Sequence, residues 1–265
     1  MLRVPAVDLQ RAAASRLGKW QAEIDALPTH AERVEWARRR FKSRNVSGNA
    51  TFREVREALG VMCSGNRRCG YCEDSVGDEV EHVAPKVHYP GLAFTWTNYL
   101  YACGPCNGPK NDLYAVRDAT GLVHDLPRGG GPVPPPAGTP LLIDPRTEDP
   151  LELLELDLAG TFRIVPRPGL PAWDRQRAKW SIMTLDLNRT YLVKGRESHF
   201  GSYRARLAEY ASKVAAGAPR AELDGLRDGL LDMSHPTVFR EMQRQAEYDP
   251  AIEAMFMGAP EALAW

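Results

Sequence analysis

The sequence lacks net charge, long apolar runs and an abundance of cysteine. Its 34 Lys and Arg residues are matched by 34 Asp and Glu residues. No apolar run approaches the roughly 18 to 20 residues that a helix needs to cross a bilayer, so we expect no membrane association. The first twenty residues contain no unbroken apolar segment of the secretory type, and a cytoplasmic location is therefore expected.

The composition is that of an ordinary globular protein, since 43% of the 265 residues are hydrophobic and 26% are charged. This excludes a mainly disordered chain and allows one large domain or two modest ones. The charge is unevenly spread, because residues 1–60 carry twelve Lys and Arg against seven Asp and Glu. A nucleic-acid enzyme that works alone often has a basic surface. Overall neutrality therefore leaves room for a local basic face, or for a partner that supplies one.

The five cysteines include two C-x-x-C pairs, Cys69/Cys72 and Cys103/Cys106. In a reducing cytosol this spacing favours a metal over disulfides. Four thiolates suit a closed tetrahedral zinc site, which leaves no open position for chemistry and is therefore structural. Cys63 is interpreted as a small buried hydrophobic residue. The alternatives are four unliganded core cysteines, or a thioredoxin-like redox pair, which the missing βαβ pattern disfavours.

Three regions are expected along the chain. Apolar spacings of three and four predict helices over residues 8–59, with a capping box formed by Thr29 and Glu32. Residues 61–120 are rich in Gly, Pro, Cys and Asn, and we expect them to bury little apolar surface. A bound metal would then stabilise the fold of this region. The division that follows is an N-terminal helical region (1–60), a metal-containing core (61–117) and a C-terminal region (118–265).

The C-terminal region should begin with a hairpin and continue as helices. A Pro/Gly-rich connection covers residues 129–140. The segment LLIDPRTEDP then resembles a short buried strand and a turn, and TFRIV resembles the second strand of a hairpin. From Trp173 onward an apolar stripe at helical spacing predicts helices to the end of the chain.

Polar residues of a catalytic type lie between and after the two cysteine pairs. A metal that joins the pairs forces the intervening loop to return on itself, which we expect as a β-hairpin. Glu81 and His82 then fall on its first arm, and Asn107 lies at the start of a helix with Lys110 one turn further on. A carboxylate, an imidazole and a carboxamide would thus meet at one small site.

This order of residues resembles a known family. C-x-x-C, Glu-His-x-x-Pro-Lys (81–86), Trp-x-Asn (96–98) and C-x-x-C-Asn-x-x-Lys (103–110) are similar to the HNH endonucleases, in their H-N-N variant. The resemblance implies an α+β fold: a small ββα-metal (HNH) core held by a four-cysteine zinc site within a mostly helical chain.

The resemblance and the residue types imply a role for each side chain. His82 is the expected general base, because imidazole titrates near neutral pH. Glu81 and Asn107 offer the hard oxygen atoms that Mg²⁺ or Mn²⁺ prefers. The middle Asn98 would orient the catalytic loop and the histidine. Two further residues are expected to contact phosphate, namely Lys86 and Lys110.

Other residues compete for these roles. His88 is the alternative base and is otherwise interpreted as substrate-facing or incidental. Asp78 and Glu79 are interpreted as solvated turn residues, with Asp78 as a second choice of metal ligand. The basic run from Arg38 to Arg44 has two interpretations, a nucleic-acid or partner contact and a solvated helix end that the helix macrodipole favours.

The flanking segments are similar to the HNH subunits of Septu-type and retron-linked antiphage systems. This is carried by FREVREALGVMCSGNRRCGYCE, by LLIDPRTEDP followed by GTFRIV, and by RAKWSIMTLDLNRTYLVKGR. The resemblance implies an ABC-type ATPase partner that controls cleavage. DNA is the favoured substrate of the expected nuclease. RNA or tRNA cleavage, a non-catalytic zinc-containing binding subunit, and a zinc redox or transfer enzyme are the alternative functions.

Overall fold

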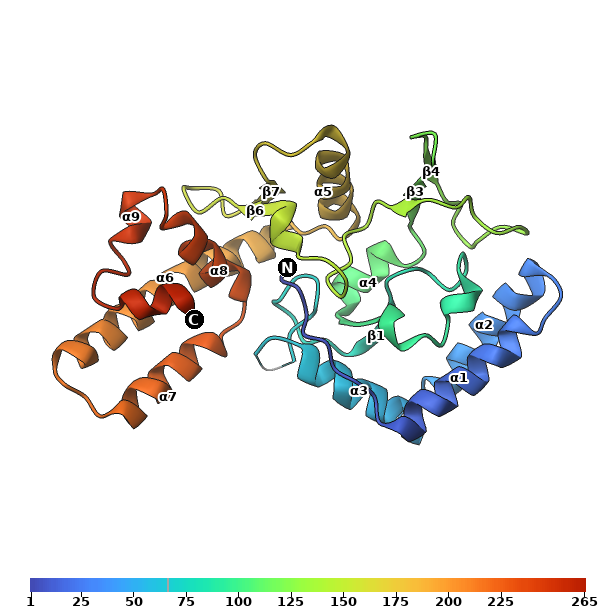
Figure 1. Cartoon of the computed structure of the whole chain (residues 1–265), viewed down its shortest axis with the longest axis horizontal. Helices are drawn as coiled ribbons and strands as arrows, with labels where there is room; N and C mark the ends of the chain where they lie inside the picture. The colour runs from blue at the N-terminus through green and yellow to red at the C-terminus, as the bar shows by residue number, and fades with distance from the viewer. Residues whose placement is uncertain (66) are drawn as a thin grey trace.

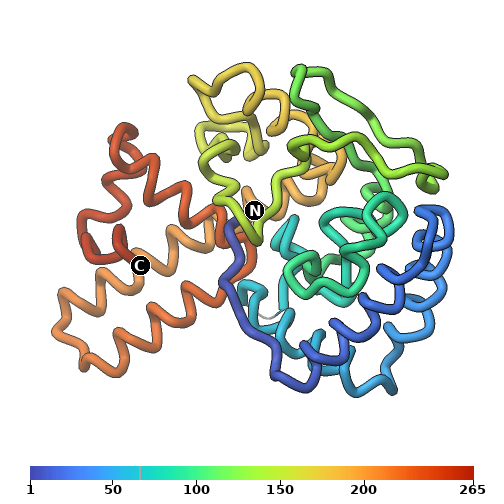
Figure 2. The backbone as a smooth tube through the Cα atoms, turned by 45° about the vertical axis from the view of Figure 1, so that its right-hand side comes forward, coloured from blue at the N-terminus to red at the C-terminus, as the bar shows by residue number. Residues whose placement is uncertain are grey.

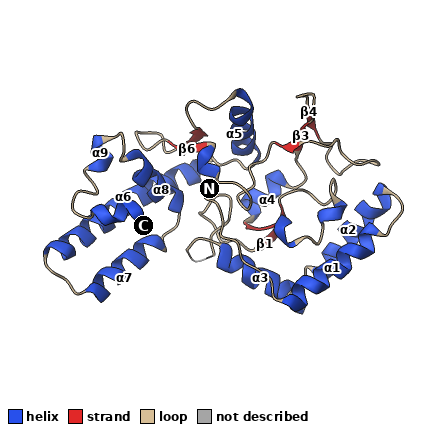
Figure 3. Cartoon of the chain, in the orientation of Figure 1, coloured by secondary structure: helices blue, strands red, loops and turns tan. Residues whose placement is uncertain are grey.

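The computed structural model describes residues 1–65 and 67–265 and is mostly helical, with three small antiparallel sheets (Figures 1 and 3). The helices are α1 (Arg11–Asp25), α2 (His30–Arg44), α3 (Ala50–Met62), α4 (Gly104–Lys110), α5 (Ala172–Thr184), α6 (Thr190–Ala215), α7 (Arg220–Leu231), α8 (Pro236–Gln245) and α9 (Pro250–Glu253). The strands are β1 (Glu79–His82), β2 (Tyr99–Ala102), β3 (Ala115–Arg117), β4 (Val123–Asp125), β5 (Thr139–Pro140), β6 (Leu154–Leu156) and β7 (Ile164–Pro166). The expected α+β class is confirmed.

Helices α1 to α3 lie on one side of the molecule, and α6 to α9 form a lobe on the other, as two views of the chain show (Figures 1 and 2). The predicted capping box is confirmed: Thr29 Oγ1 accepts from the Glu32 amide at 3.3 Å, and the Glu32 carboxylate accepts from the Thr29 amide at 3.1 Å. In the described ranges, no helix is both long and apolar enough to span a bilayer.

The hairpin of β1 and β2 lies between the two sides of the molecule. The strands pair antiparallel, with Glu79 opposite Ala102 and His82 opposite Tyr99. Side chains alternate along β2. Tyr99 and Tyr101 pack in the hydrophobic cluster of α1 to α3, whereas Leu100 and Ala102 pack in the cluster that continues into the C-terminal region. The hairpin is therefore covered on both faces.

The C-terminal region contains a hairpin whose second strand, β7, overlaps the predicted TFRIV segment, but its first strand is β6 (Leu154–Leu156), which the sequence did not single out. The predicted strand over LLI is wrong. Leu141, Leu142 and Ile143 are buried, but only Thr139–Pro140 pairs with β3 as a strand. The Leu141 amide still donates to the Ala115 carbonyl of β3 at 3.0 Å, but the Ile143 amide donates to the Ser181 hydroxyl of α5 at 2.9 Å, so backbone pairing with the sheet ends within this segment.

Candidate metal centre and catalytic pocket

The four predicted cysteines meet at one point. Their sulfur atoms all lie within 4.8 Å of one another, and Cys72 Sγ lies 3.7 Å from Cys103 Sγ. Cys69 and Cys72 precede β1, Cys103 follows β2, and Cys106 is in α4, so strand pairing brings the two pairs together. Zinc–sulfur bonds of about 2.3 Å in a tetrahedron give sulfur separations of about 3.8 Å. The buried cluster therefore fits one zinc ion.

The surroundings of the cluster suit thiolates. Arg189, immediately before α6, donates from Nη2 to Cys106 Sγ at 3.1 Å, and the Tyr71 amide donates to Cys69 Sγ at 3.4 Å. Within the cluster the thiols shift one another in opposite directions: hydrogen bonds with the other sulfurs hold the pKa of Cys72 and of Cys103 below the usual value and raise the pKa of Cys69 and of Cys106. The thiolate is the form that binds metal.

Cys63 lies outside the cluster, as expected. It is half-buried, and its thiol donates to the Leu59 carbonyl at 3.2 Å. Burial raises the pKa of this thiol to about 11, so it stays protonated at neutral pH.

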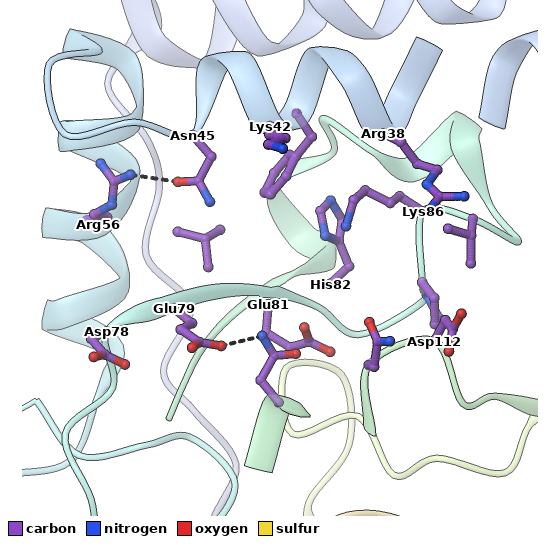
Figure 4. Close-up of a pocket in the computed structure, with 16 residues that line it drawn as sticks. Arg38, Lys42, Asn45, Arg56, Asp78, Glu79, Glu81, His82, Lys86 and Asp112 are labelled. Carbon is purple, nitrogen blue, oxygen red and sulfur yellow. Dashed lines mark hydrogen bonds between the residues drawn. The ribbon is translucent and has the colours of Figure 1, made fainter. Parts of the chain in front are cut away.

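A cavity of about 600 Å³ lies against β1 and receives several of the predicted catalytic residues (Figure 4). Glu81, His82 and Lys86 line it from the hairpin, and Asn107 lines it from α4. This volume is within the range of ordinary ligand sites.

His82 is held in one tautomer. Its Nε2 atom lies 2.9 Å from the Ala93 carbonyl oxygen, and because a carbonyl only accepts, Nε2 carries the proton. Nδ1 therefore holds a lone pair, and no hydrogen bond reaches it from residues 1–65 or 67–265. The ring packs edge-on against Phe41 at 4.3 Å. Burial, followed by the charge of Lys86, holds the pKa of His82 well below its usual value, so the imidazole is neutral.

Glu81 and Lys110 form a buried ion pair. Lys110 Nζ donates to Glu81 Oε1 and also to the His82 carbonyl, at 2.9 Å from the latter. Burial raises the pKa of Glu81, and the Lys110 ammonium opposes that rise. Lys110 has no exposed surface and does not line the cavity. Lys110 therefore serves as the partner of Glu81. The predicted phosphate contact would require an exposed ammonium group, and this one is buried.

Glu79 has a different place from the one expected. It is exposed, as expected, but it opens β1 and does not lie in a turn, and its Oε2 accepts from Asn107 Nδ2 at 2.5 Å. Asn107, on the same short helix as Lys110, is therefore bonded directly to β1, and both Asn107 and Glu79 line the cavity. Asp78 also lines the cavity and is exposed.

Asn98 fixes the loop that follows His82. Its Oδ1 accepts from the Ala84 amide at 2.8 Å, and its Nδ2 donates to the carbonyls of Ala84 at 3.0 Å and Leu92 at 3.1 Å. This geometry accords with the predicted orienting role. The rival His88 is also buried, but its Nε2 bonds the Asp112 carbonyl at 2.9 Å, and it does not line the cavity.

Three further cationic residues line the cavity: Arg38 and Lys42 of α2, which belong to the basic run left with two interpretations, and Arg56 of α3, which the sequence did not single out. A signal for the first two was present. Phe41 is part of the buried stripe of α2, and Arg38 and Lys42 lie beside it, four residues apart on one face.

No family model matches the chain. Over 69 residues, or 24% of its length, the chain is 36% identical to Septu protein PtuB of Bacillus thuringiensis. The match covers 27% of that relative, so the chain spans about a quarter of the length of the curated protein that it matches.

Proposed function

We propose that this chain is a metal-dependent endonuclease of the HNH type that hydrolyses phosphodiester bonds, with DNA as the favoured substrate. The observation that carries the proposal is the state of His82, a neutral imidazole whose Nε2–H is bonded to the Ala93 carbonyl. Its remaining lone pair is on Nδ1, and the residue lines a cavity that also contains carboxylates and cations.

His82 acts as the general base. Nδ1 takes a proton from a water molecule while the water oxygen bonds to phosphorus, and the bond from phosphorus to the 3′-oxygen breaks. The negative phosphate that enters beside Lys86 offsets the cations that depress the pKa of His82, because an opposite charge favours the imidazolium. The Ala93 carbonyl holds the ring in place throughout the proton transfer.

Glu81 and Asn107 are the proposed ligands of the catalytic Mg²⁺ or Mn²⁺, which when bound would polarise the phosphate and stabilise the leaving oxygen. Their donor atoms fit a hard cation that keeps several of its waters. Lys110 positions one oxygen of Glu81. Glu79 holds the amide nitrogen of Asn107, which leaves the amide oxygen as the free donor atom.

The biological setting proposed is an antiphage defence complex of the Septu type, with an ABC-type ATPase as partner. Two observations support it: the resemblance of the flanking segments, and the partial match to a Septu PtuB protein. The zero net charge of the chain accords with a partner that contributes to substrate binding.

The test is cleavage by wild-type protein and two histidine variants, His82→Ala and His88→Ala. Supercoiled plasmid and total RNA are incubated with Mg²⁺ or Mn²⁺, with and without chelator. Both variants remove a buried imidazole that bonds a backbone carbonyl, but only His82 lines the cavity. We expect loss of cleavage of about 100-fold or more in His82→Ala, and retained cleavage in His88→Ala.

The outcomes separate the alternatives. Equal loss in both variants, with zinc content and circular dichroism unchanged, would reject His82 as the specific base. Cleavage of RNA alone would reassign the substrate. If the wild type cleaves neither substrate, even after addition of an ATPase encoded beside it, the non-catalytic binding subunit becomes the better description.

A further inference from the structure

The basic residues of α2 point in different directions. Arg39 and Arg40 stack over the Trp36 ring, with their guanidinium carbons 4.5 Å and 4.6 Å from its centroid. Arg40 also pairs with Glu23 at 3.3 Å, and Arg44 lies over another tryptophan. These cations are thus engaged with the protein's own side chains, away from the cavity.

Arg38 and Lys42 form the second group. Both are exposed and line the cavity that contains His82 (Figure 4). In the described part of the chain neither makes an ion pair or a side-chain hydrogen bond. They lie one helical turn apart, which puts their charges side by side on one face. The helix therefore presents two free cations to the proposed catalytic site.

Cations from other elements reach the same cavity. Arg56 of α3 is held by its bond from Nη2 to Asn45 Oδ1, at 2.6 Å. Lys86 follows β1, and its Nζ lies 5.0 Å from the centroid of the Phe41 ring. The alternative interpretation, a solvated helix end whose cations interact with the helix macrodipole, does not explain why cations of other elements line the same cavity. Three separate elements supply positive charge to one wall.

The opposite wall is acidic. Glu79 and Glu81 of β1 line the cavity together with Asn107, facing α2 across it (Figure 4). The cavity thus has cations on one side and carboxylates on the other. This arrangement suits a ligand that carries negative charge along its length and that reacts where the carboxylates hold a metal cation. Phosphates that do not react would lie on the basic wall, and the reacting phosphate would lie between that wall and the carboxylates.

We propose that Arg38 and Lys42, supported by Arg56, bind the phosphate backbone of a nucleic-acid strand beside the bond that is cleaved. This deepens the proposed nuclease function and rests on it for the identity of the ligand. The cations contact phosphates and carry no base-specific contact, so they set affinity and position for DNA and RNA alike.

The test measures binding and its salt dependence in the His82→Ala protein with Mg²⁺ present. Fluorescence anisotropy follows labelled single-stranded DNA, duplex DNA and single-stranded RNA between 50 and 200 mM salt. Arg38→Gln/Lys42→Gln is compared with Arg39→Gln/Lys19→Gln, which removes equal charge from exposed positions outside the cavity.

The slope of log affinity against log salt is negative, and loss of two phosphate contacts should make it less steep by about 1.4 for a single strand and about 1.8 for a duplex. At 0.1 M salt this corresponds to affinity about 25-fold and 60-fold weaker. The control pair should keep the slope of the parent. A change of slope with all three nucleic acids is the expected result, and a change with only one of them would show which backbone the two cations contact.

An unchanged slope in Arg38→Gln/Lys42→Gln, or an equal fall in both pairs, would overturn the inference. So would a parent protein that binds none of the three nucleic acids at 50 mM salt. The two proposals can fail separately. If the wild type cleaves but the slope of Arg38→Gln/Lys42→Gln is unchanged, the nuclease proposal holds and the binding surface is rejected. If only Arg38→Gln/Lys42→Gln loses binding but the wild type does not cleave, the binding surface holds and the nuclease proposal is rejected.

Discussion

Replacement of Asn98 by alanine tests whether one amide positions the catalytic loop. The side chain is buried and makes three hydrogen bonds to the backbone of Ala84 and Leu92, at 2.8 to 3.1 Å. A typical hydrogen bond contributes about 1 kcal/mol to stability, and a buried group left without a partner costs about 1–3 kcal/mol. The Leu92 carbonyl keeps its bond from the Thr95 amide, so two backbone groups of Ala84 lose their partner, and we expect Asn98→Ala to lower the free energy of unfolding by about 2–6 kcal/mol.

The chain supplies a matched control in Asn188. This side chain bonds Ile164 in the same manner, accepting from its amide at 2.8 Å and donating to its carbonyl at 2.7 Å, in the C-terminal region away from the cavity. Urea denaturation should show losses of similar size for Asn98→Ala and Asn188→Ala. Cleavage, measured where both variants remain folded, should be lost only in Asn98→Ala. Wild-type cleavage by a destabilised Asn98→Ala would refute the positioning role.

Three further predictions concern the metal site and pH. Cys69→Ser should remove one zinc per chain and cost a large part of the roughly 5–15 kcal/mol that stabilises a typical domain. The control Cys63→Ser should keep both the zinc and the melting temperature of the wild type. A wild-type melting temperature for Cys69→Ser would contradict a structural zinc. Arg189→Met removes the donor to Cys106 and should weaken zinc retention about 10-fold or more, measured by competition with a chelator; an unchanged release curve would argue against that contact. Burial lowers the pKa of His235 to about 4 in the folded protein. As the pH falls below about 6.5, the unfolded chain therefore binds a proton before the folded protein does. The free energy of unfolding should drop by about 2–3 kcal/mol between pH 7 and pH 4.5. His235→Asn, which tolerates the left-handed backbone at this position, should flatten that dependence in urea titrations, and an unaltered pH profile would show that another group is responsible.

Features set by local chemistry could be predicted from the sequence. The Thr29 capping box needs only residues three apart, and the cysteine pairs need only their spacing and a hairpin between them. The gathering of Glu81, His82 and Asn107 follows from the same hairpin and the short helix after it.

Features set by tertiary packing could not. The burial of Lys110 against Glu81 depends on how closely α4 approaches β1, which no spacing in the sequence encodes. The direction of Arg38 depends on the rotation of α2, which follows from the tertiary contacts of its buried face, such as those of Phe41 with His82 and Phe52. The LLI segment has strand-like composition, but Ser181 of α5 takes one of its amides.

The position of the hairpin between two hydrophobic clusters has a consequence for any attempt to transplant it. The expected boundary at residue 60 would separate α1 to α3 from Val80, Tyr99 and Tyr101, which share their cluster. Excision of residues 61–117 as a cassette would expose these side chains on one face and Leu100 on the other. The motif over residues 61–117 is therefore not a portable module, and the smallest fragment that folds should extend well beyond it on both sides.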